Sequence, residues 1–138
     1  MAAATKKSAA PKPAKRDARP PVAIGHVHLE THAVAKTIDF FKSIGMRSIF
    51  RNERFGVLEL RGGTHLVVSE RDKPVRQGTL APFDIMVDDV DKAHASYGRK
   101  GFEPTDIKSG SIHSSFFIKV PSGHKLKITS SHAGRRAV

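Results

Sequence analysis

Residues 24–46 read IGHVHLETHAVAKTIDFFKSIGM, and this stretch decides how the rest of the chain is interpreted. Its first part alternates apolar and polar side chains, as a half-buried β-strand does, and places Val27 and Leu29 on one face. The opposite face carries side chains that could bind a metal or move a proton, namely His26, His28 and Glu30. An H-x-H pair on a strand is also common without any metal, so the pattern alone leaves both interpretations open.

The second part of the same stretch has the spacing of an amphipathic helix. Its apolar side chains recur at i, i+4 and i+7, at Val34, Ile38 and Phe41. Thr31 or His32 is expected to cap the helix, and Gly45 is expected to end it. Together with the two residues before it, the stretch therefore predicts one strand over 22–30, followed by one helix.

The remaining sequence predicts three short strands and then the same order again. The first three cover 46–53, 54–62 and 63–70, and a Gly62-Gly63 turn joins the last two. After a basic loop come a strand at 81–87 and a second helix with Val90, Ala93 and Tyr97 on its apolar face, capped by Asp88 or Asp89 and ended by Gly101. Three further strands are expected at 102–109, 112–120 and 124–130.

The two halves match in register as well as in order. A shift of 56 residues aligns the first strand and the helix of each half, and it places Gly45 on Gly101. A shift of 60 residues aligns the closing hairpins, and it places Gly63 on Gly123. The sequence thus predicts an internal repeat of two βαβββ modules.

Two such modules in tandem resemble the vicinal oxygen chelate superfamily, which includes glyoxalases, bleomycin-resistance proteins and ring-cleaving dioxygenases. The resemblance is carried by 24–46, by FDIMVDDVDKAHASYGRKGFEP at 83–104 and by VPSGHKLKIT at 120–129. It implies an α+β fold over 22–132, with modules at about 22–70 and 80–132 whose mixed sheet curves around a cleft and whose helices lie outside. Residues 133–138 are expected to form a C-terminal tail.

The resemblance implies metal ligands at four positions, which are occupied here by His26, Val67, Pro82 and Lys127. Valine and proline side chains offer no donor atom, and a lysine ammonium repels a cation. The resemblance therefore implies a cleft that has lost the usual metal site and needs no cofactor. A displaced site remains an alternative, with ligands drawn from His28, Asp84 and His65.

The predicted ligand-binding cleft is lined by His26, His28, Glu30, His65, Val67, Asp84, Met86, Lys125 and Lys127. Its bases outnumber its acids, which favours a small anionic or aromatic ligand. Two alternatives stay open at this point. The protein could be a lyase, an isomerase or a dioxygenase-like enzyme, using the displaced metal or Glu30 as a base with His26 or His28 as the acid. Lys127 could also pair internally with Glu30 or Asp84 and play no part in binding.

Phe116 and Phe117 stand on opposite faces of one predicted strand, so one of them is expected to line the cleft or a subunit contact. We therefore expect a homodimer.

The composition adds expectations about location and partners. The net charge is +11, and residues 1–21 contribute +5 of it through six Lys or Arg and one Asp. This Ala-, Pro- and Lys-rich tail is expected to be disordered, and weak nucleic-acid binding by it is an alternative function. The chain has no cysteine, which excludes disulfides and thiolate metal sites. With no apolar run long enough for a membrane span, we expect a cytoplasmic protein without a membrane partner.

Overall fold

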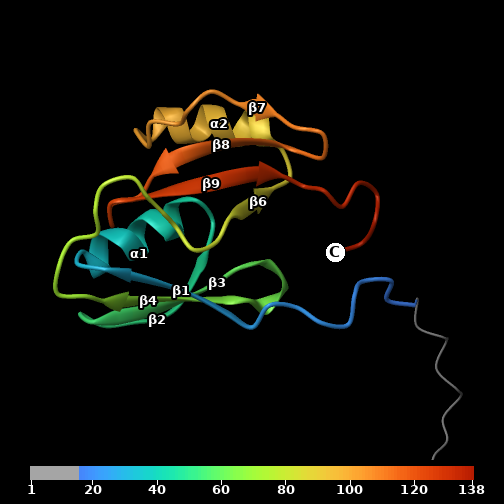
Figure 1. The fold of residues 1–138 in the computed structure, drawn as a ribbon. Coiled ribbons are helices and arrows are strands. Elements are labelled where there is room, and N and C mark those ends of the chain that lie inside the picture. Colours follow the sequence, from blue (N-terminus) through green and yellow to red (C-terminus); the bar gives the residue numbers. More distant parts are fainter. Residues whose placement is uncertain (1–15) are drawn as a thin grey trace, which may run out of the picture.

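The computed structural model describes residues 16–138. Its elements are β1 (His26–Thr31), α1 (Val34–Ser43), β2 (Arg47–Arg51), β3 (Phe55–Glu59), a short 3-10 turn (Arg61–Gly63), β4 (His65–Glu70), β5 (Thr79–Leu80), β6 (Ile85–Val87), α2 (Val90–Arg99), β7 (Lys108–Ser109), β8 (Ser114–Lys119) and β9 (His124–Ser130) (Figure 1). Residues 16–25 contain no helix or strand. The rest of the predicted disordered tail lies outside the described residues.

The strands form two mixed sheets, one in each half of the chain. The first sheet has the order β1-β4-β3-β2. In the second, β6 and β5 both pair with β9, and β8 and β7 follow on its other side. Because β6-β9-β8-β7 repeats the order of the first sheet, the α+β fold of two tandem βαβββ modules is confirmed. Each module contributes its own sheet to this fold.

The internal repeat extends to the strand register. Leu29 lies opposite Val68 on the parallel strands β1 and β4, and Ile85 lies opposite Ile128 on β6 and β9. The shift of 56 residues places Leu29 on Ile85, and the shift of 60 places Val68 on Ile128, so the two pairs are equivalent. The two modules therefore present equivalent faces at equivalent positions.

Most predicted strands are shorter than expected, and the first and the one at 102–109 show why. The first starts at His26 instead of Val22, because the strand opposite it starts at His65. In the predicted strand at 102–109, only Lys108 and Ser109 form a strand, although Phe102 and Thr105 also make backbone hydrogen bonds to β8. Glu103 in that segment has a positive φ of 52°, which interrupts an extended chain.

The helix caps differ from the prediction in one of two cases. Asp89 caps α2 as expected, accepting a hydrogen bond of 3.0 Å from the Lys92 N–H. The N-cap of α1 is Ala33, and neither Thr31 nor His32 occupies that position. The Thr31 hydroxyl instead accepts the Ala33 N–H at 2.9 Å and lies buried against the Thr37 hydroxyl at 3.1 Å. Thr31 is thus the last residue of a strand whose side chain supports the start of the helix.

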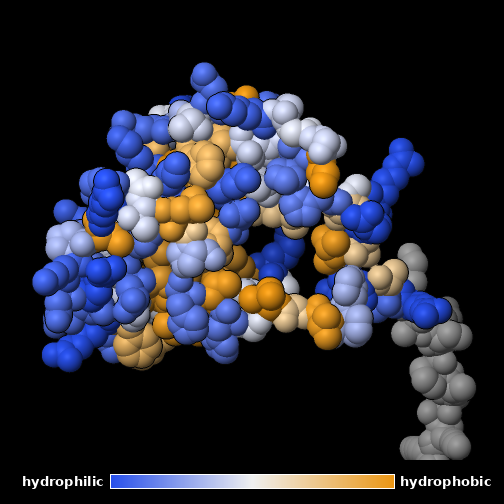
Figure 2. Space-filling view, viewed as in Figure 1, coloured by the Kyte–Doolittle hydropathy of each residue, from blue (hydrophilic) through white to orange (hydrophobic). Residues whose placement is uncertain are grey.

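Helix α1 joins the two modules. Val34 and Ile38 are buried, as the apolar spacing predicted, in the core that α1 shares with the first sheet. Phe40 reaches the second module, where its ring lies 4.7 Å from that of Phe102 between centroids. The Lys100 ammonium also donates to the last carbonyl of α1, at Ser43, over 2.5 Å. Figure 1 shows α1 between the two sheets and α2 over the second, and Figure 2 shows apolar side chains gathered along the middle of this view.

Gly56 marks the closest approach of β3 to α1, and we predict that its replacement by alanine destabilises the fold. A Cβ at this position would lie 3.1 Å from Cγ1 of the fully buried Ile38, and closer still to its Cδ1. Overpacking of this kind costs about 1–3 kcal/mol, to be measured by urea denaturation of Gly56→Ala.

The matched control is Gly25→Ala, because an added Cβ there meets no atom within 4 Å. Ile38→Val removes the obstructing methyl group, so it should cost less in the Gly56→Ala background than in the wild type. Equal costs in both backgrounds would show that the two residues do not compete for space.

Candidate functional site

The first candidate surface is the face of the first sheet that points away from α1. Leu29, Leu66 and Val68 are buried on the helix side, so the alternate side chains of β1 and β4 lie on the other face. The parallel register places His26 beside His65, and their ring centroids are 5.8 Å apart. The predicted residues of this module are therefore brought together as a row of imidazoles, and Val67 lies opposite His28.

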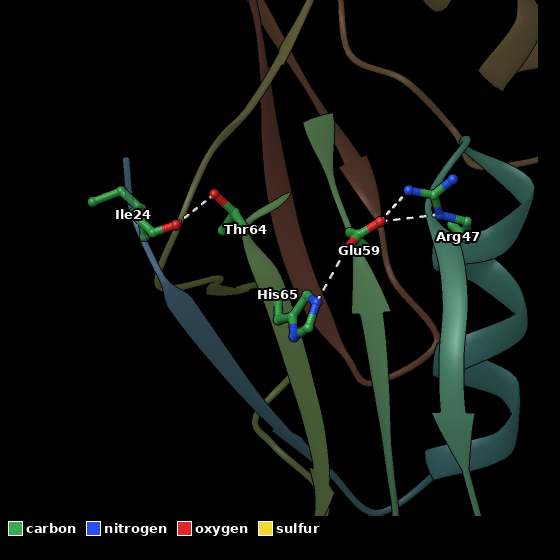
Figure 3. A network of polar contacts seen from close by, with 5 residues as sticks. All are labelled: Ile24, Arg47, Glu59, Thr64 and His65. Carbon is green, nitrogen blue, oxygen red and sulfur yellow. Dashed lines mark hydrogen bonds and ion pairs between the residues drawn. The ribbon is translucent and has the colours of Figure 1, made fainter. Parts of the chain in front are cut away.

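Glu59 holds His65 in place on this face (Figure 3). A Glu59 carboxylate oxygen lies 3.3 Å from His65 Nε2, across the antiparallel pair β3 and β4. The Arg47 guanidinium donates to the other oxygen from β2, with its Nε at 3.0 Å. The hydrogen bond from Arg47, followed by that from His65, lowers the pKa of the Glu59 carboxyl. Glu59 is therefore a carboxylate near neutral pH.

This geometry fixes which nitrogen of a neutral His65 carries the proton. A carboxylate has no hydrogen to give, so the ring must donate from Nε2. Nδ1 is then left with a free lone pair, and a carboxylate–imidazole pair of this kind can accept a proton from a bound molecule. The chemistry available on this face is metal-free proton transfer, or binding of a hydrogen-bond donor.

The sequence offered Glu30 as a base beside His26 or His28, and it did not single out Glu59. In the structure Glu30 instead lines a shallow hollow of about 320 Å³ with Arg71, Asp72 and Lys73. Within residues 16–138, no hydrogen bond joins it to a histidine. The predicted Gly62-Gly63 turn was the signal that could have identified Glu59, because the hairpin around it sets Glu59 opposite His65.

The second candidate surface is the equivalent face of the second sheet. The Lys125 ammonium stands over the Phe117 ring, 4.7 Å from its centroid, and Lys127 lies opposite Phe117 in the strand register. Phe116 is 1% exposed on the other side of β8, so the two phenylalanines do occupy opposite faces. Met86, at 41% exposure, also stays accessible.

The lysines of this face differ in their partners. Lys119 pairs with Glu103 at 3.2 Å. Among residues 16–138, no ion pair includes Lys125 or Lys127, so the structure does not pair Lys127 with Glu30 or Asp84. Two ammonium groups and an aromatic ring thus lie together without a carboxylate partner.

The predicted cleft residues fall into two sets. His26, His28, Glu30, His65 and Val67 lie on the first sheet. Met86, Lys125 and Lys127 lie on the second, and Asp84 directly precedes its strand β6. No hydrogen bond or ion pair between described residues links the two sets.

The donor set does not fit the metal that the resemblance implies. In the described part of the chain, no group of three or more His, Asp or Glu side chains is arranged to hold an ion. Val67 and Pro82 offer no donor, and Lys127 offers a positive charge. The displaced alternative draws on His28 and His65 from one sheet and Asp84 from beside the other.

Two further expectations concern membranes and nucleic acids. None of the helices in residues 16–138 is long and apolar enough to cross a bilayer. Nucleic-acid binding depends on residues 1–21, most of which lie outside the described residues, and it stays a prediction.

We predict that Glu59 sets the tautomer of His65. In wild-type protein at pH 8, long-range ¹H–¹⁵N spectra should show His65 protonated at Nε2, with Nδ1 bare. In Glu59→Leu the acceptor is absent, and the spectrum should move toward the tautomer mixture of an unrestrained imidazole. Asp39→Leu is the control, because it removes a carboxylate that pairs with Arg51 elsewhere. An unchanged His65 spectrum in Glu59→Leu would contradict the assignment.

Comparison with known proteins identifies the fold of this chain. The chain matches no model of a known protein family and no curated protein. Solved structures do match it. A lactoylglutathione lyase from Agrobacterium tumefaciens superposes with a TM-score of 0.67 at 16% identity, covering 83% of this chain and 97% of that one.

Two further structures are named as glyoxalase/bleomycin resistance protein/dioxygenase proteins. The glyoxalase/bleomycin resistance protein/dioxygenase from Alicyclobacillus acidocaldarius has a TM-score of 0.64 at 22% identity, covering 81% of this chain and 93% of its own. A member of the same superfamily from Sphaerobacter thermophilus has a TM-score of 0.67 at 15% identity, covering 80% and 98%. The fold is therefore that of the vicinal oxygen chelate superfamily, and identities this low establish the fold alone.

Proposed function

We propose that this protein binds a small molecule bearing a carboxylate or phosphate, without a metal, on the face formed by Lys125, Lys127, Phe117 and Met86. One observation carries the proposal: two lysines share this face with an aromatic ring, and within residues 16–138 no acidic side chain neutralises them. Charged side chains in half-buried positions are normally paired, so an unpaired half-buried Lys127 favours an external anion as its partner.

The face offers complementary contacts to such a ligand. A charge-assisted hydrogen bond from Lys127 contributes about 1.5–3 kcal/mol, because the half-buried ammonium is less well solvated than an exposed one. Lys125 adds attraction at longer range and stays exposed. The accessible Met86 side chain and the Phe117 ring supply apolar contact for a planar molecule.

The same residues explain why the proposed binding needs no metal. The resemblance implies a metal cation bound beside this position. Here the ammonium of Lys127 supplies positive charge from the protein itself, at one of the four positions that the resemblance assigns to metal ligands. In the proposed site, the ammonium group of Lys127 therefore takes the place of a bound metal cation.

The test is stabilisation by small anions in the presence of EDTA. Benzoate, phosphate and neutral benzamide are titrated, and melting temperature is followed for wild type, Lys127→Met and Lys36→Met. Benzoate or phosphate should stabilise the wild type and Lys36→Met, whose lysine is exposed on α1, but should stabilise Lys127→Met at least tenfold more weakly in apparent affinity. Equal stabilisation of Lys127→Met, or none of any variant, overturns the proposal.

We further propose that a homodimer completes the binding site. Among residues 16–138, strand β1 pairs with β4 alone, and the carbonyls of Gly25 and Thr31 accept bonds on that side. The backbone alternates, so the N–H and C=O groups of His26, His28 and Glu30 point to the open edge. In the same described residues, the equivalent strand β6 pairs with β9 alone. Pairing of β1 with β6 of a second copy would set the imidazole row beside the lysines in one cleft.

This arrangement predicts that a proline at position 28 dissociates the dimer. Proline removes the outward N–H of His28 without removing a bond to β4, whereas His28→Val retains that N–H and serves as the control. Light scattering at tens of micromolar should give the dimer mass for wild type and His28→Val and the monomer mass for His28→Pro. A wild-type monomer, or a dimer that survives in His28→Pro, contradicts pairing through β1.

A further inference from the structure

A second pair of histidines lies apart from both sheet faces described above. His113 is in the loop that joins β7 to β8, and His132 follows β9. Their ring centroids are 5.0 Å apart, with the ring planes at 53°. The two imidazoles come from segments separated by the whole of the closing hairpin, so tertiary structure alone brings them together.

One nitrogen of this pair lacks a partner. His113 Nδ1 is buried and makes no hydrogen bond to any described residue. A buried polar atom without a partner costs free energy, and its neighbour here is a second imidazole, which is the commonest metal-ligating side chain. A cation shared by the two rings would satisfy this nitrogen.

Both segments are held in position by their own hydrogen bonds. The Ser114 N–H, next to His113, donates to the Ser130 hydroxyl at 2.9 Å, and the His113 carbonyl accepts from the Gly110 N–H at 2.9 Å. The His132 carbonyl accepts from Arg136 at 2.7 Å, and Ala133 beside it is buried. The two rings are therefore presented by restrained backbones.

We propose that His113 and His132 bind one divalent transition-metal ion of the class that prefers nitrogen ligands, such as zinc, nickel or copper. With Zn–N bonds of 2.0–2.1 Å and a bond angle between 90° and 110°, two imidazoles sharing one ion have centroids roughly 4.5–5.2 Å apart. The observed separation of 5.0 Å falls in this range. Within residues 16–138 no acidic or third histidine ligand completes the set, so water fills the other positions.

The ion would fasten the C-terminal segment to the β7–β8 loop. Binding to the folded chain raises stability in proportion to the logarithm of metal concentration, because the unfolded chain does not hold the two rings together. Arg136 beside His132 brings positive charge close to the site, which keeps the affinity modest. This site would be independent of the proposed anion-binding face.

The experiment is a zinc titration of the full chain after EDTA treatment and removal of the chelator, followed by calorimetry and by melting temperature. We expect one equivalent to bind, and a rise of roughly 5–10 °C at a hundredfold excess of free zinc over Kd. Zinc should also shift the ring C–H resonances of His113 and His132. The exposed His132 can be replaced with little risk to the fold, and His132→Ala should weaken binding at least tenfold and abolish the rise.

His26→Ala is the matched control, because His26 belongs to two other histidine pairs, with ring centroids 5.8 Å from His65 and 6.3 Å from His28. Zinc binding that survives in His26→Ala and is lost in His132→Ala supports the site. Binding that is lost in His26→Ala and kept in His132→Ala would place the ion on the β1 face and overturn the proposal. Absence of saturable binding up to millimolar zinc would overturn it as well.

Discussion

The packing of one short helix, α1, against two modules at once is the constraint on which the rest of this structure depends. Ile38 and Phe41 are fully buried, and the Phe40 and Phe41 rings extend the same core to Phe102 and Phe83 of the second module. Close packing of this kind leaves no space between strand and helix, which is why Gly56 of β3 stands where it does. The helix-facing sides of both sheets are committed to this core.

That commitment leaves the other side of each sheet for function. Strand alternation sends every second residue of β1, β4, β6 and β9 to the open faces, and the two faces have different chemistry. The first carries imidazoles ordered by Glu59 and Arg47. The second carries lysines beside Phe117 that lack acidic partners among residues 16–138. In the proposed homodimer, the open edges of β1 and β6 are where the two faces would meet.

The difference in chemistry between the open faces and the core has a physical basis. Val67 and Lys127 lie on the open faces, where side chains do not enter the core and can change without disturbing α1 or α2. Leu29, Leu66, Ile85 and Ile128 are on the helix side, where volume and shape are constrained by packing. Because packing constrains the core more than the open faces, proteins can share this fold at sequence identities of 15–22%. The shared fold does not determine what the open faces bind.

The sequence by itself determined the repeat, the fold class and the face on which each strand residue lies. Periods of two and of 3.6 residues are local properties, and Gly45 and Gly101 end the two helices with φ angles of 118° and 82° as their positions predicted. The strand ends were less predictable, since the first strand starts where its neighbour starts and not where its composition changes.

Only the tertiary structure decided which residues of the candidate site meet. Sequence spacing placed Glu30 on the face of the histidines, but only the pairing of β3 with β4 shows that Glu59 hydrogen-bonds to His65. Nothing local brings Lys125 over Phe117 or His113 to His132, because each contact joins segments whose distance apart depends on strand pairing and hairpin closure. Periodicity assigns a side chain to a face, whereas its neighbours on that face are set by the register between strands.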